Sequence, residues 1–147
     1  MHIPKVVASL LLCTFCSTAL ANMISSHFKD KRYDFEFSCD VLSTTPAWQN
    51  ESEEPPLSPR AAVRVATTQL AALMQNAERW QLSQIALRPA CDRSHWFYVV
   101  TFAPPPSRPD GGAYSPFGLV VLMNGQAVEP RVSERRAMDP MPADTRD

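Results

Sequence analysis

The N-terminus of the chain has the three parts of a secretory signal peptide. Lys5 precedes an apolar run over residues 6–16, and residues 19–21 form an A-x-A cleavage pattern. The run is shorter than the roughly 20 residues that a membrane span needs. We therefore expect residues 1–21 to be removed after Ala21 and the remaining chain to be exported, either to the periplasm or out of the cell. An uncleaved N-terminal anchor is the alternative.

Removal of this leader changes the cysteine count. Of the four cysteines, Cys39 and Cys91 remain, and an even pair in an oxidising compartment predicts a disulfide. A bridge that closes a loop of this length contributes about 4 kcal/mol by the chain-entropy relation. A metal site is the alternative, but these cysteines and His27 and His95 lack zinc-ligand spacing. We expect no metal and no other cofactor.

Length and charge limit the possible partners. A chain of 147 residues normally forms one domain. Its 14 basic and 15 acidic residues give a net charge of −1, which argues against binding to nucleic acid or anionic lipid. After the leader, no apolar run is long enough to cross a bilayer. The sequence does not indicate an oligomeric state.

Hydrophobic periodicity predicts a strand and then a helix. Residues 33–41 alternate between apolar and polar side chains, which is typical of a strand with one buried face. Residues 44–56 are rich in proline and acidic residues and predict a loop. Ser58 and Pro59 are suitable residues for a helix start. An apolar stripe then predicts a helix from Pro59 to residue 77 or 79.

Four further strands follow in the predicted order. Residues 82–87 alternate again, and we expect Pro89 to end that strand. Residues 95–102 are aromatic or β-branched on both faces, which predicts a central strand. A proline-rich loop over residues 103–115 precedes a strand over residues 117–123, and Asn124 and Gly125 predict a hairpin turn. Residues 126–132 would return along that strand.

The order of strand, helix and four strands predicts an α+β fold in which one helix packs across an antiparallel sheet. We assign residues 22–132 to a single domain of this class. Residues 133–147 are polar and contain two prolines, and they predict a disordered tail.

Residues 58–130 resemble a PepSY domain. The resemblance rests on the stretch around Ser58 and Pro59, on Trp80, on the aromatic strand that starts at Trp96, and on residues 118–128 around Gly125. It implies a small non-catalytic, exported module that binds or restrains a secreted or envelope peptidase. The two-layer arrangement that it implies also occurs in cystatin-like folds, and a fold alone does not give a function.

The remaining residues favour binding over catalysis. No G-x-S-x-G turn is present, and cysteines in a disulfide cannot act as nucleophiles. On the central strand, the alternate positions Trp96, Tyr98, Val100 and Phe102 should face the helix. His95 and Phe97 would lie on the opposite face, which either is covered by residues 22–41 or binds an envelope or secreted protein. A small exported hydrolase that uses His95 and a purely structural envelope protein are the alternatives.

Overall fold

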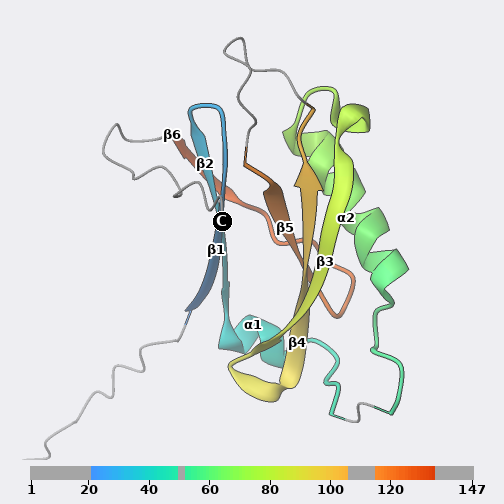
Figure 1. Cartoon of the computed structure of the whole chain (residues 1–147). Coiled ribbons are helices and arrows are strands. Elements are labelled where there is room, and N and C mark those ends of the chain that lie inside the picture. The colour runs from blue at the N-terminus through green and yellow to red at the C-terminus, as the bar shows by residue number, and fades with distance from the viewer. Residues whose placement is uncertain (1–20, 50–51, 106–114, 135–147) are drawn as a thin grey trace, which may run out of the picture.

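The computed structural model describes residues 21–49, 52–105 and 115–134 (Figure 1). In these residues the elements follow one another in the order β1 (Ala21–Phe28), β2 (Lys31–Ser38), α1 (Cys39–Ser43), α2 (Pro59–Leu73), the 3-10 turn η1 (Ala77–Arg79), β3 (Gln81–Ala90), β4 (Asp92–Ala103), β5 (Phe117–Leu122) and β6 (Arg131–Glu134). The α+β class predicted from the sequence is therefore confirmed.

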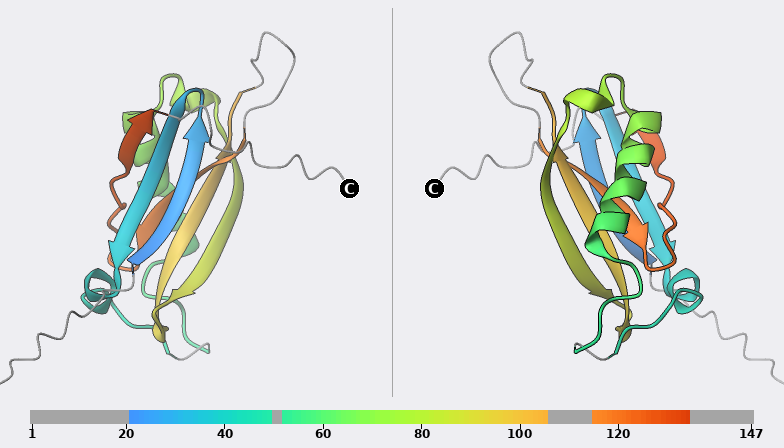
Figure 2. Two further views of the ribbon diagram at one scale, coloured as in Figure 1. Left: turned by 90° about the vertical axis from the view of Figure 1, so that its left-hand side faces the viewer. Right: turned by 90° about the vertical axis from the view of Figure 1, so that its right-hand side faces the viewer.

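The strands form two antiparallel sheets instead of the single sheet that the sequence predicts. One sheet has the strand order β1-β2-β6 and the other has the order β3-β4-β5. The β3-β4-β5 sheet lies between α2 and the β1–β2 hairpin, as the two side views in Figure 2 show. As predicted, β4 is a central strand, and most of its second half is buried on both faces.

Helix α2 begins where the sequence predicts. Ser58 accepts a hydrogen bond from the backbone N–H of Ala61, and Pro59 occupies the first turn. Because Ala62 and Ala66 are small, the helix axis can approach the sheet closely, and both are fully buried. The helix ends earlier than predicted, at Leu73. The chain is already extended at residue 74 and left-handed at residue 76, so residues 77–79 form a separate turn.

Aromatic rings and one hydroxyl join the hairpin to the second sheet. The Phe117 ring centroid lies 4.9 Å from that of Tyr33 and 6.0 Å from that of Trp80. Trp80 in turn lies 4.9 Å from Phe28. The buried Ser26 hydroxyl donates to the C=O of Gly118 and accepts from its N–H, both at 2.9 Å. It therefore satisfies the backbone groups of Gly118, which lies in β5, the strand at the edge of the second sheet.

Three other local predictions differ from the structure. The predicted strand over residues 33–41 ends at Ser38, because the Ser38 side chain accepts from the backbone N–H of Val41 and caps α1. Strand β3 continues through Pro89 to Ala90, which an edge strand permits because one of its edges needs no ladder hydrogen bond.

The return after Gly125 is also shorter than predicted. Gly125 occupies the turn with φ of 81°, but the chain then makes a single bridge, between Val121 and Ala127. It leaves β5 and pairs with β2 as β6, which includes residues 133 and 134 beyond the predicted domain boundary.

Several predictions concern residues outside the described ranges. They are the signal peptide over residues 1–21 up to residue 20, most of the proline-rich loop over residues 103–115, and the predicted tail from residue 135 onward. Strand β1 begins at Ala21, the residue after which we expect cleavage.

Candidate functional site

Cys39 and Cys91 form the predicted disulfide. It joins the start of α1 to the turn between β3 and β4, with 5.8 Å between the two Cα atoms. The Asn22 side-chain amide donates to the Cys91 sulfur at 3.3 Å. The bridge therefore links α1 covalently to the β3–β4 turn at the lower end of the molecule in Figure 1.

The strand face that carries Phe97 is covered by the N-terminal hairpin. Phe97 is only 4% exposed, and its ring centroid lies 4.9 Å from that of Phe37 in β2. Of the two arrangements considered for this face, the structure has the one in which residues 22–41 cover it. Phe97 consequently offers a partner almost no surface, and partner binding by His95 stays a prediction.

His95 belongs to a small polar cluster at the start of β4. Its Nδ1 lies 2.9 Å from a carboxylate oxygen of Asp92 and 3.2 Å from the Ser94 hydroxyl. Hydrogen bonds with His95 and Ser94 lower the pKa of Asp92 to about 2. Although these residue types are those of a serine hydrolase, both partners meet the same imidazole nitrogen. A catalytic relay needs the carboxylate and the serine on opposite nitrogens. The Asp92 carboxylate also accepts from the backbone N–H groups of Ser94 and His95, so this cluster is suited to shaping the start of β4.

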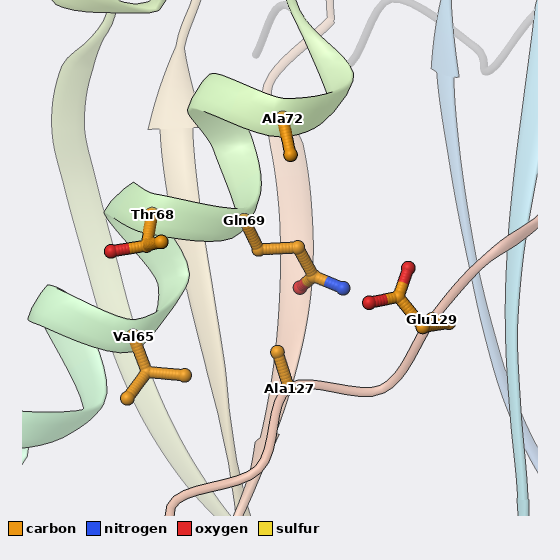
Figure 3. Close-up of a pocket in the computed structure, with 6 residues that line it drawn as sticks. All are labelled: Val65, Thr68, Gln69, Ala72, Ala127 and Glu129. Atoms are coloured by element: carbon orange, nitrogen blue, oxygen red, sulfur yellow. The ribbon is translucent and has the colours of Figure 1, made fainter.

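An open pocket of about 330 Å³ lies between α2 and the segment that leads from β5 to β6 (Figure 3). Its walls are mostly apolar. They comprise the side chains of Val65, Thr68, Gln69, Ala72, Ala127 and Glu129. We refer to it below as the Gln69 pocket.

Gln69 is the distinctive residue of this pocket. The side chain is only 6% exposed, and its Nε2 donates to the backbone C=O of Val128 at 2.6 Å. Because a carbonyl can only accept, this bond fixes which way the amide points. The other amide atom, Oε1, is buried and has no hydrogen-bond partner in the part of the chain that the structure describes.

No family model matches the chain, and no match was found among curated proteins or among solved structures. The resemblance to PepSY domains stays a prediction from the sequence.

The other polar groups of the Gln69 pocket are also acceptors. The Thr68 hydroxyl donates its hydrogen to the backbone C=O of Arg64, which leaves its lone pairs available. Glu129 is exposed and contributes a carboxylate, the one charged group in the pocket wall. The arrangement therefore suits a ligand that donates hydrogen bonds, carries positive charge and has a short apolar part.

Two other kinds of feature, a metal-binding cluster and a membrane-spanning helix, are absent from the described residues. Across residues 21–49, 52–105 and 115–134, no three His, Cys, Asp or Glu side chains are grouped closely enough to hold a metal ion. Within the same ranges, no helix has the length and apolar character that crossing a membrane requires.

Sequence reasoning did not identify Gln69. The predicted apolar stripe included the neighbouring positions Ala66, Leu70 and Leu73, and Gln69 lies among them on the buried side of α2. A long polar residue within such a stripe is a usable signal, because a buried amide needs partners. What the sequence could not supply is the opposite wall, since residues 127–129 reach α2 only because the chain leaves β5 so early.

Proposed function

We propose that this protein is an exported, non-enzymatic binding module whose ligand site is the Gln69 pocket. The unpartnered Oε1 of a buried glutamine supports this proposal most strongly. The predicted signal peptide and the Cys39–Cys91 bridge are consistent with export.

A buried acceptor without a partner is unfavourable in a folded protein. Such a group lowers stability by about 1–3 kcal/mol relative to a paired one. Folded proteins leave few groups in this state, and those they leave often have a role. An N–H donor from a ligand would form the missing bond and recover this energy on binding.

The ligand class follows from the acceptors in the pocket. Gln69 Oε1 and the Glu129 carboxylate are the acceptors available to an ammonium or guanidinium group, whereas the Thr68 oxygen points away from the Gln69 amide in Figure 3. The methyl groups of Val65, Ala72 and Ala127 can contact a short aliphatic stem. A lysine or arginine side chain of an envelope or secreted protein has both parts, so we infer that the pocket receives such a side chain.

Hexylammonium, a minimal lysine analogue, tests this assignment by NMR. We expect saturable shifts of the Gln69 side-chain amide resonances and of the Val128 and Glu129 backbone amides. Gln69→Met removes the acceptor and should weaken binding about tenfold or more, as for a hydrogen bond to a charged group. Glu129→Gln should weaken it about twofold to fivefold, because this carboxylate is exposed.

Matched controls lie outside the Gln69 pocket. Gln84 and Glu36 are exposed on β3 and β2, and neither lines this pocket. Gln84→Met and Glu36→Gln should leave hexylammonium binding unchanged. Equal binding by Gln69→Met and the unmodified protein, with both folded, would refute the proposed site.

A further inference from the structure

A second, larger pocket lies at the end of the molecule opposite the disulfide. It has a volume of about 560 Å³ and is formed by the β1–β2 turn and the segment between α2 and β3. Both segments lie at the top of Figures 1 and 2. The lining residues that matter here are Lys29, Lys31, Tyr33, Met74, Arg79 and Trp80.

The charge of this pocket is positive. Lys29, Lys31 and Arg79 line it, and Asp30 is the one acidic residue among the lining residues. Within residues 21–49, 52–105 and 115–134, none of these three basic side chains forms an ion pair. Three cations around one cavity repel one another, and an anion between them would relieve that repulsion.

Two aromatic side chains add neutral hydrogen-bond donors. Tyr33 and Trp80 are 6% and 8% exposed, but their polar atoms are not fully buried. In the described part of the chain, no hydrogen bond joins the Tyr33 hydroxyl or the Trp80 indole N–H to another residue, whereas the Trp48 and Trp96 indoles donate to the backbone C=O of Glu53 and Trp48 respectively. The Tyr33 and Trp80 groups can therefore donate to a ligand in the cavity that they line.

The Tyr33 group is in its donor form at neutral pH, as an ordinary tyrosine is, and burial moves its pKa further in that direction. Desolvation by the surrounding protein raises the pKa of the Tyr33 hydroxyl above its usual value of 10.0, so the group remains protonated at neutral pH. The pocket therefore offers one hydroxyl and one indole N–H beside three cationic side chains. Its polarity is the opposite of that of the Gln69 pocket, which offers acceptors.

The walls between these polar groups are apolar. Phe28, Leu73, Met74 and Trp80 line the same cavity, and the Phe28 and Trp80 rings lie 4.9 Å apart. A bare inorganic anion would use only the polar part of the pocket. We propose that this second pocket binds a small organic anion, an oxyanion group attached to an apolar body, with Arg79, Tyr33 and Trp80 as its main donors.

Hexanoate titration observed by NMR tests the proposal, because the three tryptophan indoles give separate N–H resonances. Trp80 is the indole without a protein partner, so its N–H resonance should shift downfield and saturate. The Trp48 and Trp96 resonances should stay in place. Binding should weaken as ionic strength rises from about 0.01 M to about 1 M, because the Debye length falls from about 30 Å to about 3 Å.

Variants and related probes separate charge from apolar contact. Arg79→Gln and Tyr33→Phe should each weaken hexanoate binding about tenfold or more, in keeping with the loss of one hydrogen bond to a charged group. Arg64→Gln, on the exposed face of α2, should have no effect. Inorganic phosphate that shifts Trp80 as strongly as hexanoate would support a phosphate-bearing ligand, and a weaker response would support a carboxylate on an apolar chain.

Two results would overturn this inference. One is the absence of any saturable Trp80 shift with both hexanoate and phosphate. The other is an equal shift with hexanol, since a neutral alcohol cannot use the cations. The outcome is independent of the Gln69 pocket, because hexylammonium should move the Gln69 amide resonances and leave the Trp80 resonance unchanged.

Discussion

Removal of the Cys39–Cys91 bridge should sharply reduce the stability of this fold. The two cysteines are separated by 52 positions in the sequence. Closing a loop of this length lowers the entropy of the unfolded chain by an amount worth about 4 kcal/mol at 25 °C. Small domains have a free energy of unfolding of about 5–15 kcal/mol, so the double variant Cys39→Ala/Cys91→Ala should be left with little stability.

Urea denaturation followed by tryptophan fluorescence measures this loss. The free energy of unfolding should fall by about 4 kcal/mol, and the m-value should rise because an unfolded chain without the cross-link is more expanded. Asn22→Ala is the matched control at the same corner, since it removes the hydrogen bond to the Cys91 sulfur but keeps the bridge. Its effect should be about 1 kcal/mol or less.

A small effect of the double variant would refute this reasoning. If its free energy of unfolding falls by less than about 1 kcal/mol, the bridge does not restrict the unfolded chain as the loop length implies. The two ends of the loop would then have to be held together in the unfolded chain by other interactions.

Two further predictions follow from individual contacts. Ser26→Ala should lower the free energy of unfolding by about 2 kcal/mol in urea denaturation, because it leaves the buried N–H and C=O of Gly118 without their partner. The exposed variant Ser25→Ala is the comparison. An effect of Ser26→Ala no larger than that of Ser25→Ala would contradict the link between β1 and β5. Asp92 should titrate with a pKa of about 2 when its carboxyl carbon is followed by NMR, because His95 and Ser94 hydrogen-bond to the carboxylate. Since the folded-state pKa is lowered, the stability that Asp92 contributes is present above pH 4 or so and is lost as the pH falls toward 2; a midpoint near the ordinary 3.8 would show that the cluster does not form.

The sequence predicted those elements whose signals are local. The Ser58 cap and Pro59 located the start of α2, and Gly125 located the turn after β5. The aromatic content of residues 95–102 identified a central strand, and the cysteine count identified the disulfide.

The predictions failed where a distant segment or a single side chain decides the structure. Residues 33–41 alternate throughout, but the Ser38 hydroxyl starts α1 three residues before the pattern ends. Strand β1 was not predicted, because residues 21–28 lack a clear alternation and depend on pairing with β2. Strand β6 was missed because it pairs with β2, about 100 residues away in the sequence.

The two pockets could not be predicted for the same reason. Gln69 meets Val128 across 59 positions, and the second pocket joins the turn at residues 29–31 to residues 74–80. In neither case does a sequence motif indicate that the two segments come together in the fold. The sequence alone shows Gln69 within the apolar stripe of α2, and it shows Lys29, Lys31 and Arg79. Neither feature indicates a site unless the segment that packs opposite it is known.

A crystal structure of the protein with hexylammonium tests the central claim, that the buried Gln69 amide is a ligand acceptor, most directly. We predict the ammonium nitrogen about 3 Å from Gln69 Oε1, with the alkyl chain against Val65 and Ala72 and with Nε2 still bonded to Val128. An ammonium group bound elsewhere, with only an ordered water on Gln69 Oε1, would contradict the claim.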